Sequence, residues 1–351
     1  MATATASATT ATTGTARPLP PLPVDDPRLR IPTLQDVYRA RQVVNRYLKP
    51  TPLLASPALS ERLGCDISLK CENLQPIGAF KIRGGLNLLS QLSDEEKAKG
   101  VVTASTGNHG QSIAYAARRF GVRAVVFMPE RANPLKVASM ERLGAEVVFH
   151  GPDFDTCRVE AETHAAREGM YYVHPANEAR LIAGVATYSL EIVEEIPDLD
   201  VLIVPVGGGS GLCGACLAGK GINPHLTVIG VQSRHAPVVH DSWRRRELLE
   251  YDRADTFAEG MATRTAFELP AHILWARVDD IRLVTDAELR RAILTILETT
   301  RMLAEGAGAA AVAAAYQMRH DLTGKKVAAV LSGGNLTLDG LKQAMDEEQA
   351  W

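Results

Sequence analysis

Short runs of β-branched and apolar residues alternate with amphipathic stretches along most of this chain, and the alternation predicts its architecture. Between residues 101 and 174, four apolar runs, "VVTAS", "AVVFM", "AEVVFH" and "MYYVH", are separated by stretches with helical periodicity. A second series starts with "VLIVPV" at residues 201–206, passes through a glycine-rich loop and a helix, and returns as "LTVIGVQ". Strands that alternate with helices are typical of parallel α/β sheets. The pattern therefore predicts two open α/β units.

Local signals place several boundaries. The stretch "NPLKVASMERLG" begins with Asn133 as an N-cap and Pro134 at the first helical position, and Gly144 follows its last turn. Two longer helical patterns cover residues 286–305 and 308–320, and a final strand follows in "KVAAVLSGGN". These segments extend the α/β pattern into the last part of the chain.

The first 30 residues show no such pattern. "MATATASATTATTGTA" is of low complexity, and "RPLPPLPVDDP" is rich in proline, so we expect an extended or disordered tail outside any core. The whole chain of 351 residues is long for one domain. This length suits two lobes that share a cleft.

Charge and cysteine content exclude several classes of protein. Lys+Arg 38 against Asp+Glu 41 gives a net charge of −3, and the longest basic run is "RRR" at residues 244–246, which argues against a nucleic-acid partner. No apolar run approaches the roughly 20 residues of a membrane span. The five cysteines are an odd number without framework spacing. We therefore expect a cytoplasmic protein in a reducing compartment.

The stretch "GAFKIRGGLN" contains the first candidate for chemistry. It places Lys81 between Phe80 and Ile82, just before an arginine and two glycines. A solvated surface lysine has no need of glycines, which weaken a helix. Taken alone, however, a single lysine is most simply interpreted as a surface residue.

A glycine loop in "VPVGGGSGLCGACLAGKG" follows a strand and opens a helix. The backbone amides of Gly207 to Gly211 can converge there on an anion, and a tight turn would need fewer glycines, so the pattern favours a phosphate cradle. "GACLAGKG" has Walker A spacing, but Gly221 stands in place of the Ser/Thr and the match lies within the helix, so we reject a P-loop. Cys213 and Cys216 in "CGAC" are better explained by packing than as a redox pair.

A second loop between a strand and a helix carries polar groups in "ASTGNHGQ". Ser105, Thr106, Gly107 and Asn108 precede the helix, and hydroxyls with free amides at a helix N-terminus suit a carboxylate. Ordinary N-capping by Ser105 or Thr106 is an equally good explanation at this point. His109, taken alone, is typical of a structural histidine.

The last strand ends in "LSGGN", at the edge where open α/β sheets place ligand groups. Ser332 alone would be interpreted as a turn former. Together with the three preceding motifs, however, this stretch resembles the pyridoxal-phosphate enzymes of fold type II, the tryptophan synthase β-like type, in the threonine/serine dehydratase and serine racemase branch. The resemblance runs from about residue 34 to residue 338. It rests on "FKIRGGLN", "STGNHGQ", "GGGSGLCG" and "LSGGN" in the family's order, with "TFAEGMAT" and "AEGAGAAAVAAA" in further agreement.

The resemblance implies the roles of individual residues. Lys81 matches the lysine that forms the Schiff base with the cofactor, pyridoxal 5′-phosphate. Asn108 would contact the ring's 3′-oxygen, Ser332 the pyridine nitrogen, and the glycine loop the phosphate. The implied cofactor site comprises Phe80, Lys81, Asn108, Gly207, Gly208, Gly209, Ser210, Gly211 and Ser332. The implied substrate-carboxylate site comprises Ser105, Thr106, Asn108 and His109, and Lys81 and Thr106 are the implied catalytic residues.

The resemblance also implies the fold and the reaction. We expect an α/β fold of two open twisted sheets with flanking helices, in two lobes with the cofactor in the cleft between them. After the tail of residues 1–30, the large cofactor-binding domain would comprise residues 31–97 and 178–351, and the small α/β domain residues 98–177. The implied reaction is dehydration of a β-hydroxy-α-amino acid such as L-threonine or L-serine to a 2-oxo acid and ammonia, with Lys81 as general base.

Several positions depart from the family pattern. Gln232 stands where serine racemases have a metal-binding carboxylate, so we expect no divalent metal there. Thr106 replaces the serine that acts as the second base in racemases. The loop "GGGSGL" is one residue longer than expected, and residues 183–187 read "AGVAT" where "AGQGT" is expected. The last two differences suggest a sub-branch, and they leave the substrate open between threonine and other β-hydroxy amino acids.

Alternative functions remain open from the sequence. A dehydratase for a bulkier or acidic substrate of the phenylserine or hydroxyaspartate type, a serine racemase and a β-replacement synthase share this scaffold. A non-catalytic amino-acid sensor is the alternative outside enzymes, although a sensor has no need of Lys81. We expect a small-molecule substrate and a homo-oligomer, a dimer or tetramer. Because the chain ends shortly after Asn335, we expect no C-terminal regulatory module.

Overall fold

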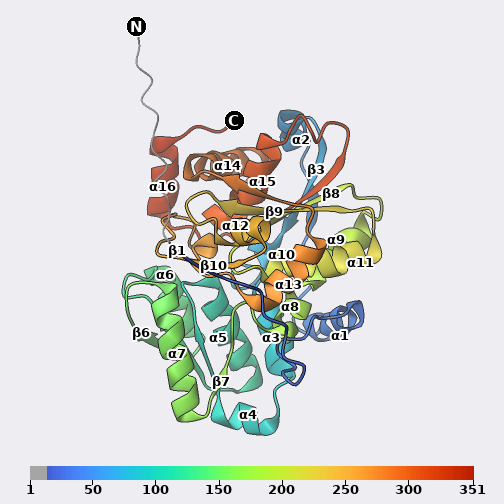
Figure 1. The fold of residues 1–351 in the computed structure, drawn as a ribbon. Coiled ribbons are helices and arrows are strands. Elements are labelled where there is room, and N and C mark those ends of the chain that lie inside the picture. The colour runs from blue at the N-terminus through green and yellow to red at the C-terminus, as the bar shows by residue number, and fades with distance from the viewer. Residues whose placement is uncertain (1–13) are drawn as a thin grey trace.

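The strands of the protein form two main sheets (Figure 1). The computed structural model describes residues 14–351. One sheet has six strands in the order β11-β9-β8-β12-β3-β2, of which only β2 is antiparallel to its neighbour, and the other has four parallel strands in the order β6-β5-β4-β7. The expected fold of two open α/β sheets is thereby confirmed. The strands are β2 (Leu53–Ala55), β3 (Asp66–Cys71), β4 (Val101–Ala104), β5 (Ala124–Met128), β6 (Glu146–Phe149), β7 (Tyr171–Tyr172), β8 (Val201–Pro205), β9 (Thr227–Ser233), β11 (Asp280–Val284) and β12 (Lys326–Leu331).

Helices flank both sheets. α5 and α7 contact the strands of the smaller sheet, and α10 and α15 contact β8 of the larger one. The helices are α1 (Leu34–Val44), α2 (Pro57–Leu63), α3 (Ile82–Ser90), α4 (Asp94–Lys99), α5 (Asn108–Phe120), α6 (Pro134–Arg142), α7 (Phe154–Glu168), α8 (Ala179–Val185), α9 (Thr187–Glu195), α10 (Ser210–Gly214), α11 (Lys220–Ile222), α12 (Val238–Arg245), α13 (Glu268–Arg277), α14 (Asp286–Thr300), α15 (Gly306–Gln317) and α16 (Leu338–Glu347). A π-helical turn (Ala215–Gly219) joins α10 to α11, and short 3₁₀ turns cover Glu72–Leu74 and Glu259–Met261.

The central strands are readable in the sequence because helices cover both of their faces. β8 and β12 are almost entirely buried, so nearly all of their residues are apolar. The signals for α6 are also confirmed, because the Asn133 side chain accepts a hydrogen bond from the Leu135 amide and Pro134 opens the helix. α14, in contrast, ends at Thr300 rather than at residue 305. Arg301 adopts a left-handed conformation with φ of 64° and terminates it.

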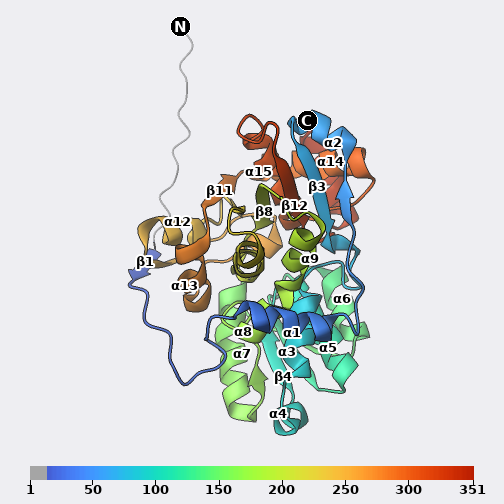
Figure 2. The same ribbon diagram turned by 90° about the vertical axis from the view of Figure 1, so that its right-hand side faces the viewer.

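The N-terminal segment differs from the expected extended or disordered tail. Residues 1–13 lie outside the described residues, so the expectation is not tested there. From Gly14 onward the chain is ordered, because β1 (Gly14–Arg17) pairs antiparallel with β10 (Leu248–Tyr251). Figure 2 shows the dark blue segment after β1 passing α13 and returning to α1. Leucines between its prolines pack against the core, namely Leu19, Leu22 and Leu29.

The two sheets draw on different parts of the chain. Strands of the larger sheet come from residues 53–71 and 201–331, and strands of the smaller sheet come from residues 101–172. This segregation supports our proposal of a large domain comprising residues 31–97 and 178–351 and a small domain comprising residues 98–177. Within residues 14–351, no helix is long and apolar enough to span a membrane.

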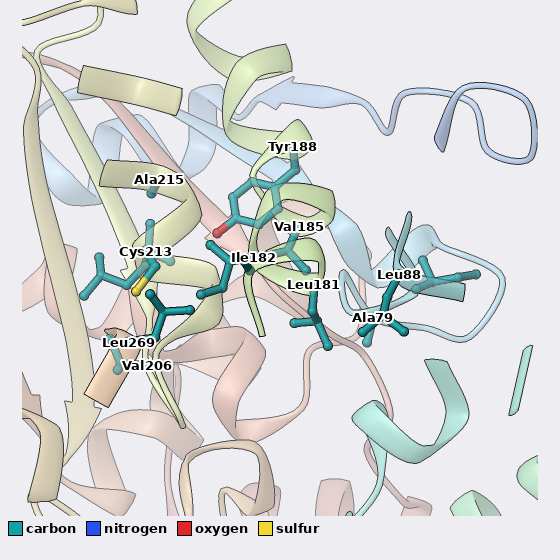
Figure 3. Packing of buried hydrophobic residues seen from close by; sticks show 14 of the residues in the cluster. Ala79, Leu88, Leu181, Ile182, Val185, Tyr188, Val206, Cys213, Ala215 and Leu269 are labelled. Atoms are coloured by element: carbon teal, nitrogen blue, oxygen red, sulfur yellow. The ribbon is translucent and has the colours of Figure 1, made fainter. Parts of the chain in front are cut away.

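A hydrophobic core underlies the chain segments that form the candidate site (Figure 3). In this view the Tyr188 ring from α9 points toward the helix that carries Cys213 and Ala215. Its hydroxyl donates a hydrogen bond to the Gly211 carbonyl oxygen at 2.9 Å. Burial raises the pKa of the Cys213 thiol well above its usual value, and both cysteines of "CGAC" are unpaired. The prediction that these cysteines serve packing is confirmed.

Candidate active site

One cavity opens at the carboxyl ends of β4, β8 and β12. Parallel strands place ligand groups at this edge. The structure brings every residue of the predicted site into the lining of this one cavity: Phe80, Lys81, Ser105, Thr106, Asn108, His109, Gly207, Gly208, Gly209, Ser210, Gly211 and Ser332.

Close helix packing places Lys81 at the start of α3. A Cβ on Gly84 would lie 2.9 Å from the Leu181 side chain of α8, and a Cβ on Gly85 would lie 2.7 Å from the Ser112 carbonyl oxygen of α5. The two glycines after Lys81 therefore let α3 approach both neighbouring helices. The Ser112 hydroxyl also donates a hydrogen bond to the Lys81 carbonyl oxygen at 2.6 Å.

Arg83, in the same motif, anchors α3 through a buried network of ion pairs. Arg83 is fully buried and forms ion pairs with Glu72 at 2.8 Å and with Glu191 at 2.6 Å. Lys70, also buried, pairs with Glu191 at 2.6 Å. Because every buried charge in this network has a partner, the network holds the first turn of α3 in one position.

The amine of Lys81 faces the glycine loop. Its Nζ lies 3.3 Å from Ser210 Oγ, to which it donates a hydrogen bond. Burial lowers the pKa of Lys81 to about 8. In a substantial fraction of the molecules, the Lys81 amine is therefore neutral near pH 8. A neutral amine can act as a nucleophile or a base.

The glycine loop has no room for side chains and fits a phosphate group. A Cβ on Gly207 would lie 2.2 Å from the Gly260 carbonyl oxygen, and Gly209 adopts a φ of 103°, which favours glycine. α10 begins at Ser210, so amides of its first turn have no intrahelical acceptor. These amides suit an anion such as the cofactor's phosphate.

Ser332 is the residue directly after β12 and lines the cavity. It is 6% exposed, and its hydroxyl lies 3.4 Å from the Ala307 carbonyl oxygen. Its own carbonyl oxygen accepts a hydrogen bond from the Phe80 amide at 3.1 Å, which connects β12 to the residue before Lys81. A neutral hydroxyl at this position fits a pyridine nitrogen without protonating it.

The N-terminus of α5 combines capping with free donors. Ser105 Oγ accepts hydrogen bonds from the amides of Gly107 at 2.9 Å and Gly110 at 2.8 Å, so Ser105 does act as a cap. Thr106 is half-buried and lines the cavity. The Asn108 and His109 amides belong to the first turn, which leaves them available to a carboxylate.

The imidazole of His109 is held within the fold through its Nε2. Its Nε2 lies 2.9 Å from Thr103 Oγ1, and the Thr103 hydroxyl donates its own proton to the Val173 carbonyl oxygen at 2.7 Å. Because this hydroxyl can then only accept a hydrogen bond from the ring, Nε2 carries the proton. Nδ1 is then an acceptor. Burial holds the pKa of His109 well below its usual value, so the ring is neutral. Only the backbone amide of His109 remains as a donor to the substrate.

Three charged residues at the site were missed from the sequence. Glu305 Oε1 accepts a hydrogen bond from Asn108 Nδ2 at 2.5 Å, and Asn108 Oδ1 accepts one from Asn335 at 2.8 Å, so the Asn108 amide is fixed. Lys136 of α6 pairs with Glu259 at 2.5 Å and with Glu305 at 3.5 Å. The two acids occur in "TFAEGMAT" and "AEGAGAAAVAAA", which were the available signal.

Lys136 lies on α6, beside the smaller sheet, and its two acidic partners, Glu259 and Glu305, belong to the larger lobe. Its side chain is 4% exposed. Burial opposes its charge, but the carboxylates of Glu305 and Glu259 hold the pKa of Lys136 above its usual value. This charged cluster therefore ties the two lobes together beside Asn108.

Gln232 serves a structural purpose at the position of the expected metal ligand. Its Oε1 accepts hydrogen bonds from the amides of Val239 at 3.1 Å and His240 at 2.9 Å, at the start of α12. This neutral oxygen is thus already engaged. From Gly14 to Trp351, no group of three or more His, Cys, Asp or Glu side chains is arranged to hold a metal ion.

Two α/β sheets, a partly neutral lysine in a cavity, a glycine cradle and a facing serine together define a pyridoxal-phosphate enzyme of the tryptophan synthase β fold type. A model of the family described as "Pyridoxal-phosphate dependent enzyme" matches residues 44–333. The chain belongs to this family, and the expected cofactor is confirmed.

Several relatives share most of the chain. It is 40% identical over 315 residues to an L-threonine ammonia-lyase of Thermotoga maritima, covering 90% of this chain and 78% of that protein. It is 36% identical to an L-threo-3-hydroxyaspartate ammonia-lyase of Saccharomyces cerevisiae, covering 88% and 94%.

Solved structures are similar in fold. The processed threonine deaminase isoform 2 of Solanum lycopersicum superimposes with a TM-score of 0.84 at 29% identity, covering 93% of this chain and 98% of that one. The serine racemase of Dictyostelium discoideum superimposes with a TM-score of 0.81 at 33% identity, covering 88% and 99%. These relatives cover nearly all of the chain, including both sheets.

Proposed function

We propose that the protein is a dehydratase, an ammonia-lyase that converts a β-hydroxy-α-amino acid to a 2-oxo acid and ammonia. The observation that carries this proposal is the buried Lys81, whose pKa is lowered to about 8, in one cavity with the glycine loop and Ser332. The similarity to proteins named L-threonine ammonia-lyase supports it.

Residues of the chain hold the cofactor and tune it. The backbone amides of residues 207–211 would bind the phosphate. The side-chain amide of Asn108, which Glu305 and Asn335 hold in place, would face the ring's 3′-oxygen. Bound pyridoxal phosphate supplies an electron sink for the charge that develops at the substrate Cα. Because Ser332 is neutral, it does not keep the ring nitrogen protonated as an aspartate would. The weaker sink favours elimination over a long-lived carbanion.

Residues of the chain also move the protons. The substrate carboxylate is oriented by the backbone amides of Asn108 and His109 and by the hydroxyl of Thr106. Lys81 Nζ, when neutral, accepts the proton from the substrate Cα. The β-hydroxyl leaves with a proton as water, so the substrate loses one water in all. The released enamine tautomerises to an imine, which water hydrolyses to the 2-oxo acid and ammonia.

The charge of the cavity favours a substrate with an uncharged side chain. Among the described residues of its lining, Lys81 is the only cation, because the His109 ring is neutral. Glu259 and Glu305 also line it, and because Lys136 compensates only one of these two charges, the remaining negative charge would repel a second substrate carboxylate. L-Threonine or L-serine is therefore preferred to the hydroxyaspartate type. Phe154 and Phe267 also line the cavity and take up room that a phenyl side chain would need, so we expect the phenylserine type to be disfavoured.

A racemase activity is the second candidate, since Thr106 lines the cavity and a similar structure is a serine racemase. Thr106 has a hydroxyl that can carry a proton. Its methyl group restricts the rotamer, so we expect racemisation to be slower than elimination.

A panel of amino acids tests the proposal. We expect L-threonine and L-serine to give the highest kcat/KM for 2-oxo acid formation, and threo-3-hydroxyaspartate and phenylserine to give values at least about tenfold lower. A clear preference for hydroxyaspartate would contradict the charge argument. Complete absence of 2-oxo acid from every member would contradict the dehydratase proposal.

We also propose that the enzyme acts in the cytoplasm as a homo-oligomer, a dimer or tetramer. Five unpaired cysteines support a reducing compartment. Leu338 and Met345 of α16 are 81% and 62% exposed, and such apolar residues support an interface between subunits. Light scattering on the purified protein measures the oligomeric state directly.

A further inference from the structure

The N-terminal strap, defined here as residues 14–30, binds to α13 through polar contacts. Arg17 forms an ion pair with Glu268, in the first turn of α13. The Pro20 carbonyl oxygen lies 2.8 Å from the ring Nε2 of His272, one turn further along. Residues 268 and 272 lie on the same face of a helix. The strap therefore contacts one face of α13.

The other face of α13 supports the glycine loop. A Cβ placed on Gly209 would lie 3.0 Å from the Pro270 side chain and 3.6 Å from that of Leu274. Positions 270 and 274 are rotated by about 200° from positions 268 and 272, at 3.6 residues per turn. α13 thus lies between the strap and the phosphate cradle. Phe267, just before α13, would contact a Cβ on Gly208 at 3.5 Å.

The strap docks in the way that a proline-rich peptide docks on a peptide-recognition domain. In "RPLPPLP", residues 17–23, Leu19 and Leu22 pack against the main hydrophobic core, while Arg17 pairs with Glu268. A proline-rich segment is already extended, so it loses little entropy on docking. Both ends are also fixed: β1 pairs with β10, and the Arg28 carbonyl oxygen accepts a hydrogen bond from the Ala179 amide at 2.7 Å.

We propose that the strap is a positioning element for the phosphate cradle, which raises the affinity of this chain for its cofactor without touching it. Docking of the strap holds α13 against Gly208 and Gly209, so the loop amides are preorganised for the phosphate. The inference rests on the glycine loop as the phosphate site. It does not depend on which amino acid the enzyme dehydrates.

Cofactor affinity with and without a phosphate group tests this proposal. Apoenzyme of the full chain, of a truncation lacking residues 1–30 and of Arg17→Ala is titrated with pyridoxal phosphate and with pyridoxal. Arg30→Ala is the matched control, because Arg30 is also in the strap but pairs with Asp36 of α1 at 2.7 Å. Each melting temperature is recorded alongside, and the titrations are carried out well below it.

We expect the Kd for pyridoxal phosphate to rise about tenfold on truncation. We expect a rise of about 2- to 5-fold in Arg17→Ala. The Kd for pyridoxal, and both Kd values in Arg30→Ala, should stay close to those of the full chain. kcat at saturating cofactor should also stay close to that of the full chain, because the strap does not contact the reacting atoms.

Three results would overturn the proposal. A lower melting temperature with an unchanged Kd for pyridoxal phosphate would make the strap a stabilising element only. Equal weakening for pyridoxal and pyridoxal phosphate would show that the phosphate cradle is not what the strap positions. If the truncated chain does not fold, the arginine variants decide, and equal Kd values in Arg17→Ala and Arg30→Ala would overturn it.

Discussion

Lys81 Nζ donates a hydrogen bond to Ser210 Oγ at 3.3 Å, although 129 residues separate them in the chain. This contact joins the start of α3 to the glycine loop after β8. It places the amine beside the backbone that would hold the cofactor's phosphate. The reactive lysine and the phosphate cradle are thus one structural unit.

The lowered pKa of Lys81 predicts how the apoenzyme takes up its cofactor. Capture of an aldehyde needs the neutral amine, and burial moves the pKa of Lys81 from 10.5 to about 8. The neutral form therefore predominates above about pH 8 and is lost as the pH falls. Stopped-flow absorbance should show an uptake rate that rises with pH and is half-maximal near pH 8. A midpoint near the usual pKa of lysine would contradict the effect of burial.

Ser332→Asp tests the partner of the ring nitrogen. A carboxylate would keep that nitrogen protonated and strengthen the electron sink, so side reactions should increase relative to elimination while cofactor is retained. The measurement is the ratio of 2-oxo acid to racemised or transaminated product, and Ser332→Ala is the control. An unchanged ratio with cofactor bound would count against Ser332 in this role.

Removal of divalent metal should leave the activity intact. A hard cation needs six or more oxygens with at least one carboxylate, and the Gln232 oxygen is already engaged by two amides of α12. Activity is compared before and after exhaustive treatment with EDTA. If chelation abolishes turnover and Mg²⁺ or Ca²⁺ alone restores it, our interpretation of Gln232 is wrong.

Lys136→Met should destabilise the protein through the acids that it leaves behind. Glu305, with a side chain 7% exposed, would lose its cationic partner, and breaking such a buried pair costs about 3 kcal/mol in the free energy of unfolding. Lys99→Met is the control, because its pair with Glu95 at 2.7 Å is exposed, and no measurable change is expected there. Denaturant unfolding compares the two. Equal stability of both variants would mean that the Lys136 cluster does not hold the lobes together.

Much of the fold was readable from the sequence for a physical reason. Strands covered on both faces, such as β8 and β12, are continuous apolar runs, and Asn133 with Pro134 marks a helix start. The end of α14 was not readable, because Arg301 takes a left-handed conformation that usually signals glycine. β1 was not readable either, since its partner β10 is distant in sequence and "GTAR" has no alternation.

The candidate site divides in the same way. Residues in contiguous motifs, such as Lys81 and Ser332, were identified together. Lys136 was missed because its role depends on two acids that only the tertiary fold brings to it. The direction of the His109 imidazole was not predictable, since the sequence does not reveal that its Nε2–H donates a hydrogen bond to Thr103 Oγ1. Motifs predict which segments meet, whereas side-chain direction requires the packed structure.

The most direct test of the central claim is the site of the cofactor's covalent attachment. The holoenzyme is reduced with borohydride and digested, and its peptides are weighed, with Lys81→Ala treated in parallel. We predict that the reduced cofactor is found on the peptide that contains Lys81. In Lys81→Ala it should be absent, and turnover should be about 10⁴-fold lower with the fold intact. Attachment to another lysine, or near wild-type turnover in Lys81→Ala, would contradict the account.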